Sequence, residues 1–292
     1  MELGRVVRGD VDFGPGARAL YAYDASIFRQ VPVGVVTPRD AEDVAAALAV
    51  CRRHGAPVLG RGCGTGLAGQ TVNEAVVFDF SRHMNALVNV DPGRRQARVQ
   101  PGVICDDLRD AAEEHGLTFG PDPATHDHAT LGGMIGNNSC GTHSVLAALY
   151  GTGPRTSDNI DELDILTYDG LRMRVGATSE RELRAIIAAG GRRGEIYAGL
   201  KRIADTYADA IRDGLPDIPR WVSGYNIDEL LPEKGFNVAR ALVGSEGTCA
   251  MVLEATTRLV HSPPDRSLVV LGYPDIPPSP RASYRTGGMT GT

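Results

Sequence analysis

The chain has 292 residues, enough for one large or two ordinary domains at about 150 residues per domain. Hydrophobic residues make up 42% and charged residues 23%, a composition typical of a globular protein with an ordinary core. The formal net charge of −6 and the lack of a lysine- and arginine-rich block argue against nucleic acid as the partner, so we expect a small-molecule ligand.

The five cysteines are odd in number, widely spaced and never arranged as C-x-x-C. This pattern indicates reduced thiols and speaks against a disulfide framework, a zinc site or an iron–sulfur site. The N-terminus lacks the apolar stretch of a signal peptide, and no window approaches the roughly 18 apolar residues of a transmembrane helix. From the sequence we therefore expect a soluble, cytoplasmic protein.

The first part of the chain predicts a strand–helix–strand unit. Residues 1–30 show no strong period and are interpreted as an extension packed on the domain. Residues 33–36 read as a strand, Thr37 as the N-cap of a helix over 41–54, and residues 57–60 as the next strand. This order places the loop that follows at the end of a strand in an α/β unit, where open sheets usually bind ligands.

That loop is the most unusual stretch of the chain, with five glycines among residues 60–70. Glycine tolerates positive φ and has no Cβ, so consecutive amides can turn toward one anion, and phosphate is the usual one. The spacing of Gly64, Gly66 and Gly69 matches G-x-G-x-x-G, but a nicotinamide site requires a helix inside the motif and an acidic residue about 20 positions on. Residues 75–80 read instead as a strand. A diphosphate cradle is favoured, with a tight ligand-free connection as the alternative.

The next segments predict a hairpin over 87–100, a helix over 106–115, and then a long, nearly uncharged loop over 120–141. Loops of more than about 12–15 residues without structure of their own are uncommon and tend to be functional, so this segment is expected to form the second wall of the site. His126 and His128 lack a third ligand cluster, which favours hydrogen-bonding histidines, and we assign no metal.

After a connector over 145–158, residues 160–175 predict a second hairpin. Two helices are expected over 179–189, with a capping box of Ser179 and Glu182, and over 195–212. In the second helix the apolar residues at spacing four, Ile203, Tyr207 and Ile211, are interpreted as core.

The last predicted elements are a strand over 238–243, a glycine turn over 244–248 and a strand over 249–260. The turn could close on the same ligand as the glycine loop. Glu246 within it could act as a base, although a glutamate in such a turn more often caps it.

Three segments in this order, 61–66, 121–138 and 242–248, together resemble the FAD-linked oxidase family with the flavin domain of the p-cresol methylhydroxylase (PCMH) and vanillyl-alcohol oxidase type. The resemblance extends over about residues 20–273. It is greatest to the D-type subunit of glycolate oxidase, to D-lactate dehydrogenase and to D-2-hydroxyglutarate dehydrogenase. The spelling of residues 136–141 resembles large bacterial members that carry an iron–sulfur domain.

The resemblance implies an α+β fold, in which a PCMH-type FAD-binding domain over 31–262 consists of two α+β subdomains, about 31–103 and 104–262, with FAD between them. It further implies a substrate or cap domain that would begin at 263–273 and supply the catalytic residues, so none is assigned in this chain. Residues 274–292 are rich in proline and glycine, which indicates a disordered tail. The expectation is a truncated or frame-shifted product.

The resemblance also implies which residues hold FAD: the glycine loop around the diphosphate, the 121–141 segment along the ribityl chain and isoalloxazine, Ile160 near the adenine, and Glu246 in the closing turn. FAD is expected to be non-covalent, because Cys63 stands where the histidine-linked relatives have a histidine. The expected cofactor-binding residues are Arg61, Gly62, Cys63, Gly64, Thr65, Gly66, Leu67, Gln70, Pro121, Asp122, Thr125, Thr130, Gly132, Gly133, Asn137, Ser139, Gly141, Ile160 and Glu246.

The function implied is the flavin part of a D-2-hydroxy-acid dehydrogenase, with a small 2-hydroxy acid as substrate and an electron acceptor that the residues do not specify. Hydride would pass from substrate C2 to flavin N5. The alternative is an FAD-binding module without turnover of its own, since the pattern of a cap domain stops near Asp275.

Overall fold

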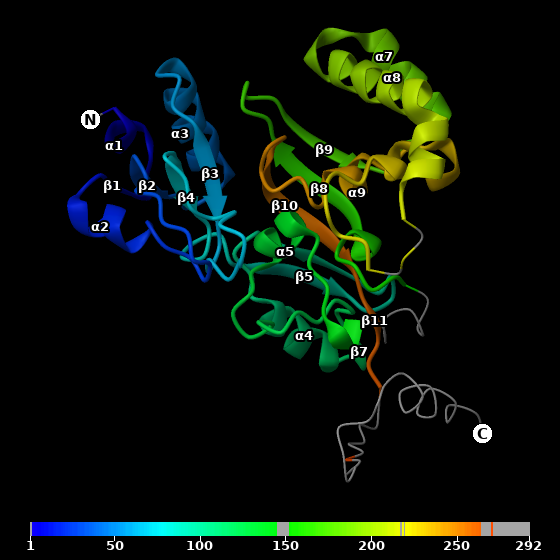
Figure 1. The fold of residues 1–292 in the computed structure, drawn as a ribbon, viewed down its shortest axis with the longest axis horizontal. Coiled ribbons are helices and arrows are strands. Elements are labelled where there is room, and N and C mark those ends of the chain that lie inside the picture. Colours follow the sequence, from blue (N-terminus) through cyan, green and yellow to red (C-terminus); the bar gives the residue numbers. More distant parts are fainter. Residues whose placement is uncertain (1, 145–151, 217, 219, 264–269, 271–292) are drawn as a thin grey trace. The chain divides into compact units, whose positions relative to one another are not determined.

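The computed structural model describes residues 2–144, 152–216, 218, 220–263 and 270, and residues 1–262 form one compact unit. Two sheets organise this unit (Figure 1). The tail expected over 274–292 and residues 145–151 of the expected connector lie outside the described residues. No described helix has the length and apolar character needed to cross a membrane.

The first sheet contains the predicted strand–helix–strand unit, and its strand order is β1-β2-β4-β3. Strands β2 and β3 both run parallel to β4, and β2 and β4 are buried at every position, as expected of parallel strands covered by helices. The elements of this part are α1 (Leu3–Val6), β1 (Asp10–Asp12), α2 (Pro15–Leu20), β2 (Gly34–Thr37), α3 (Ala41–Arg53), β3 (Val58–Arg61) and β4 (Val76–Asp79).

Two details of this part differ from the prediction. Residues 1–30 pack on the domain as expected, but they also contribute β1, which pairs antiparallel with β2 as an edge strand. The N-cap of α3 is Asp40, whose side chain accepts from the Asp43 amide, and Thr37 is instead the last residue of β2. Both residues are good N-caps, and the length of β2 decides between them.

The second sheet has the order β5-β6-β10-β8-β9, and every pair in it is antiparallel. Its strands are β5 (Leu87–Asp91), β6 (Gln96–Val99), β8 (Ile160–Leu166), β9 (Arg172–Gly176) and β10 (Met251–Arg258). Both predicted hairpins are present. The hairpin of β5 and β6 belongs to this sheet, so the two sheets divide between β4 and β5 and not at residue 103, because β10 pairs with β6 across a long stretch of sequence.

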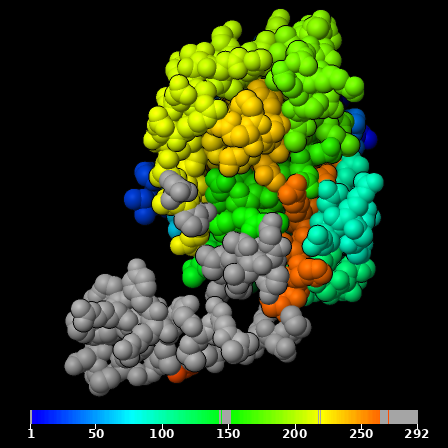
Figure 2. Space-filling model, turned by 90° about the vertical axis from the view of Figure 1, so that its right-hand side faces the viewer, coloured from blue at the N-terminus to red at the C-terminus, as the bar shows by residue number. Residues whose placement is uncertain are grey.

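Helix α4 (Cys105–Glu113) packs beside the short β7 (Leu117–Thr118), which pairs with β11 (Val260–His261). Helices α7 (Glu180–Ala189) and α8 (Gly191–Gly214) pack against each other, and their atoms form part of the surface seen in Figure 2. The capping box of α7 is confirmed. In α8, Ile211 is buried as expected, whereas Ile203 and Tyr207 are 39% and 56% exposed, so the prediction that they belong to the core is wrong.

Two predictions of local structure are wrong. The 120–141 segment contains a helix, α5 (Leu131–Asn137), which begins where the Thr130 side chain accepts from the Gly133 amide. Residues 238–242 form α9 (Val238–Leu242) and not a strand, because the Asn237 side chain caps the Arg240 amide. Short apolar runs do not distinguish strand from helix by period. The remaining short turns are η1 (Thr142–Ser144), η2 (Ser157–Asn159), η3 (Ile227–Leu230) and η4 (Pro232–Lys234).

Candidate functional site

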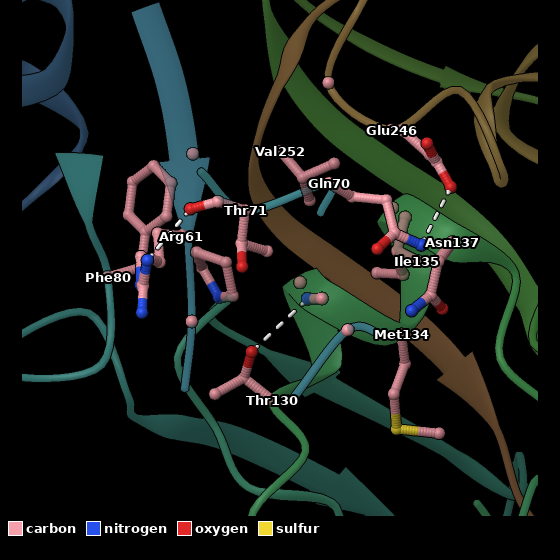
Figure 3. A pocket seen from close by; sticks show the side chains of 18 of the residues that line it. Arg61, Gln70, Thr71, Phe80, Thr130, Met134, Ile135, Asn137, Glu246 and Val252 are labelled. Atoms are coloured by element: carbon pink, nitrogen blue, oxygen red, sulfur yellow. Dashed lines mark hydrogen bonds between the residues drawn. The ribbon is translucent and has the colours of Figure 1, made fainter. Parts of the chain in front are cut away.

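A cavity of about 1210 Å³ lies where the loop after β3, helix α5 and the start of β10 come together. Figure 3 shows side chains from these three elements pointing into one space, among them Gln70, Met134 and Val252. The volume is at the upper end of the range for small-molecule sites, so the space is large enough for a bulky ligand.

The glycine loop presents amide donors to this cavity. Within the described part of the chain, no amide N–H of residues 63–67 donates to a protein acceptor, whereas the Ala68 amide donates to Gln70 Oε1. Gly64 has a φ of +72°, and a Cβ built there would lie 2.6 Å from Arg61 Nη2. The loop therefore offers consecutive unpaired donors on a backbone that excludes larger residues, which is the arrangement that binds phosphate.

The second wall meets the first by close backbone approach. A Cβ on Gly62 would lie 2.0 Å from Thr130 Oγ1, and a Cβ on Gly132 would lie 2.7 Å from Pro101 Cβ. The first amides of α5 are already used, because Leu131 and Gly132 donate to carbonyls of the 101–103 stretch and Gly133 donates to Thr130. These glycines therefore set the distance between the walls, and their amides do not serve as free anion donors.

The third wall is the turn before β10. Glu246 has a positive φ of +50°, and its amide donates to the Gly136 carbonyl at 2.8 Å, so α5 holds the turn in place. Gln70 Nε2 lies 3.4 Å from Glu246 Oε1, joining the glycine loop to this turn (Figure 3). The side chain thus does what was expected of the residue as a structural element, and no described contact assigns it the role of a base.

Most of the predicted cofactor-binding residues line the cavity: Arg61, Gly62, Cys63, Gly64, Thr65, Gly66, Gln70, Thr125, Thr130, Gly132, Gly133, Asn137, Ser139 and Glu246. The structure therefore brings together residues that are up to 185 positions apart between Arg61 and Glu246 in the sequence.

The other predicted residues do not line it. Leu67 is 77% exposed, and Ile160 is fully buried in the core of the second sheet. Asp122 pairs with Arg109 at 2.7 Å, and a Cβ on Gly141 would lie 1.6 Å from the Asp122 carbonyl oxygen. Together with the buried Pro121, these last residues shape the segment behind the cavity.

Sequence reasoning missed the apolar lining. Its members come from strand ends and from α5, where an apolar residue is ordinarily read as core, so no local signal separates them from core residues. They are Val58, Leu59, Phe80, Pro101, Ala129, Met134, Ile135, Leu242, Ala250, Met251 and Val252.

Charge is scarce in the cavity: Arg61 and Glu246 are the charged side chains among the described residues that line it. Arg61 is only 9% exposed, and its guanidinium donates to the carbonyls of Thr71 at 2.9 Å and Tyr23 at 2.7 Å. Burial lowers the pKa of this guanidinium. His126, a candidate metal ligand by sequence, bonds Asp106 at 2.7 Å from Nδ1 and so has the hydrogen-bonding role that the sequence favours.

A second hollow adjoins the first and shares Gln70, Asn137 and Glu246 with it. Its further lining is mostly polar and includes residues 222–225, which are absent from the predicted set. Tyr225 Oη lies 2.8 Å from Thr248 Oγ1 across this hollow. The site as a whole thus combines an apolar chamber, a row of amide donors and a polar chamber.

Comparison with known proteins agrees with this geometry. Residues 32–176 match the family described as FAD binding domain. The chain is 34% identical over 270 residues to D-2-hydroxyglutarate dehydrogenase of Pseudomonas putida, covering 91% of this chain and 26% of the relative. It is 28% identical over 267 residues to glycolate oxidase subunit GlcD of Bacillus subtilis, covering 91% of this chain and 45% of the relative.

Among solved structures, 6-hydroxy-D-nicotine oxidase from Arthrobacter nicotinovorans superposes with a TM-score of 0.56 at 19% identity, covering 87% of this chain and 43% of that chain. At this identity the likeness concerns the fold alone, and it confirms the expected α+β class. The chain spans about a quarter of the length of the D-2-hydroxyglutarate dehydrogenase that it matches.

Proposed function

We propose, from the premise that this chain belongs to the FAD-linked oxidases through the FAD binding domain at residues 32–176, that it is the flavin-binding part of a D-2-hydroxy-acid dehydrogenase. The single observation that carries the cofactor assignment is the row of unpaired amides at residues 63–67 on the wall of a large cavity. The relatives that include D-2-hydroxyglutarate dehydrogenase and glycolate oxidase support a small 2-hydroxy acid as substrate.

The described residues fit FAD in three respects. Amides of the glycine loop would receive the diphosphate, which needs donors and no side-chain bulk. The apolar lining, including Phe80 and Val252, would pack on a flat ring system, and the polar hollow would receive hydroxyl-bearing parts. We propose the lining residues of the predicted set as the contacts, with Leu67, Pro121, Asp122, Gly141 and Ile160 in supporting positions.

When bound, FAD would supply the two-electron acceptor for hydride from the substrate C2 atom. The chain's own residues bind and orient: the glycine loop supplies donors, α5 and the turn at 244–247 hold the walls at a set distance, and the apolar lining excludes water. Water exclusion strengthens each polar contact inside the cavity.

A second candidate, an FAD-binding module without turnover of its own, is favoured by one observation. Arg61 is the cation among the described residues lining the cavity, and its guanidinium is committed to backbone carbonyls. A 2-hydroxy acid carries a carboxylate, which is usually bound by a free arginine or lysine. The described cavity offers none.

The proposal is tested by expressing residues 1–292, removing any bound flavin and titrating the protein with FAD. We expect one FAD per chain with a shifted flavin absorption spectrum, and release of the flavin into the supernatant on acid precipitation. Burial and the Asp79 carboxylate raise the pKa of the Cys63 thiol, which disfavours a reactive thiolate at the cavity wall. Flavin that stays with the pellet would contradict non-covalent binding, and absence of any spectral shift would contradict the cofactor assignment.

A further inference from the structure

The N-terminal stretch 21–28 lies outside the residues matched by the family, yet it makes the densest set of contacts to the glycine loop. It folds back on itself, with Tyr23 bridged to Arg29 and the Gln30 amide donating to the Ala22 carbonyl. The tip of this turn, from Asp24 to Phe28, then faces the loop that leaves β3.

One contact controls the direction of a peptide plane in the loop. The Ala25 amide donates to the Gly64 carbonyl at 2.9 Å. In a planar trans peptide the carbonyl and the following N–H point in opposite directions. Holding the Gly64 carbonyl toward Ala25 therefore directs the Thr65 N–H to the other side, and Ala25 is not among the cavity residues, whereas Thr65 is.

Further contacts fix the two ends of the loop. Asp24 Oδ2 accepts from Thr71 Oγ1 at 2.9 Å, while its Oδ1 accepts from the Ser26 amide at 2.8 Å. Arg61, at the start of the loop, donates to the carbonyls of both Tyr23 and Thr71. The same guanidinium lies 5.2 Å from the centre of the Tyr21 ring, a cation–π contact.

The aromatic ring of Phe28 closes the far side. Gly69 has a φ of +79°, and a Cβ built on it would lie 2.8 Å from Phe28 Cδ2, so the ring packs directly on the loop backbone. A glycine-rich loop on its own loses much conformational entropy on ordering. A turn that already holds its peptide planes removes part of that loss from the binding step.

We propose that residues 21–28 are positioning residues of the cofactor site: they hold the glycine loop so that its amides face the cavity before the cofactor arrives. This inference rests on the proposed function, because it assumes that the anion received by the loop is the FAD diphosphate.

The test is a double-mutant cycle on the Asp24–Thr71 hydrogen bond, with Asp24→Ala, Thr71→Val and the double variant. The FAD dissociation constant is measured by titration, and the melting temperature of each FAD-free protein is measured beside it. We expect each single variant to weaken FAD binding by about tenfold or more, and the double variant to be little weaker than either, since both substitutions remove one shared contact. Thr71→Ser, which keeps the hydroxyl, should restore most of the affinity.

Ile27→Ser is the matched control, because Ile27 belongs to the same turn but is 95% exposed. It should leave FAD affinity unchanged. Ala25→Pro, which deletes the donor to Gly64, should weaken FAD binding as Asp24→Ala does. Unchanged affinity in Asp24→Ala, additive effects in the cycle, or a loss of affinity that only follows a lower melting temperature would overturn the proposal. If the parent protein itself binds no FAD, the proposed function fails and this inference falls with it.

Discussion

At the scale of single residues, glycines and one arginine shape the site without supplying its chemistry. Gly62 and Gly132 allow the two walls to approach at their backbones, and Gly64 adopts a φ that side-chain-bearing residues rarely reach. Arg61 uses its donors on carbonyls, so its charge organises the loop. Substitution at these positions should therefore affect cofactor binding more than the stability of the whole domain.

Gly64→Val should abolish FAD retention while the protein stays folded. The new side chain would have to adopt a strained φ, at a cost of about 1–3 kcal/mol, and its Cβ would displace the Arg61 guanidinium. Flavin content and circular dichroism are compared with those of the parent. Gly190→Val is the control, since Gly190 has a φ of +68° with nothing within 4 Å of a built Cβ. It should lose similar stability and keep FAD. Equal flavin occupancy in Gly64→Val would remove the loop from the site.

At the scale of elements, buried polar side chains tie helices to strands and loops. The Asp43 carboxylate in α3, only 2% exposed, accepts from the amides of Arg8, Gly9 and Arg39. Asn138 ends α5 in the left-handed conformation, and its Oδ1 accepts from the Ser157 amide at 3.0 Å. Each side chain satisfies donors that burial would otherwise leave unpaired.

Asp43 should make stability fall at acid pH. Burial raises the pKa of this carboxyl, but the amide donors of Arg39 and Arg8 outweigh burial, and the net shift is downward. A group whose pKa is lower in the folded state stabilises above its unfolded pKa, about 3.9 for aspartate, and loses that contribution as pH falls through the folded value.

The measurement is the free energy of unfolding from pH 7 to pH 2. Asp43→Asn should lower it by about 2 kcal/mol at pH 7 and flatten its fall below about pH 4. Asp205→Asn serves as the control, because Asp205 pairs with Lys201 on the exposed face of α8. It should change stability by less than about 1 kcal/mol. An unchanged acid profile in Asp43→Asn would contradict the assignment.

Asn138→Ala should lower the free energy of unfolding by about 3 kcal/mol, because it leaves the buried Ser157 amide unpaired and places alanine in the left-handed region. Denaturant unfolding gives this value. Arg95→Ala is the control for the backbone part, since Arg95 has a φ of +52° and is exposed. The control should lose less than about 1 kcal/mol. Equal losses in the two variants would show that the hydrogen bond contributes nothing.

At the scale of the whole molecule, the two sheets supply opposite walls of one cavity, and the described lining contains no cation free to bind a substrate carboxylate. Catalysis requires the reacting atoms to be held about 3–3.5 Å apart with a base in reach. The described walls meet the first need for the cofactor and neither need for the substrate.

We therefore expect residues 1–292, loaded with FAD, to reduce a dye acceptor with D-lactate, glycolate or D-2-hydroxyglutarate far below the ordinary range of about 1–1000 per second. Steady-state dye reduction and anaerobic flavin bleaching are followed in parallel, with FAD-free protein as the blank. Turnover within the ordinary range would show that this chain carries the substrate contacts itself, and would exclude the binding-module alternative.

Local signals in the sequence determined the strand–helix–strand unit, both hairpins, the capping box at Ser179 and the glycine loop, because each depends on contacts between near neighbours. The family resemblance extended this to FAD and to most of the cavity residues. Only the tertiary structure decided that 238–242 is a helix, that β10 lies between β6 and β8, and that the turn at 21–28 supports the loop. These depend on partners far away along the chain, and an apolar residue such as Val252 is spelled alike in a core and in a cavity wall.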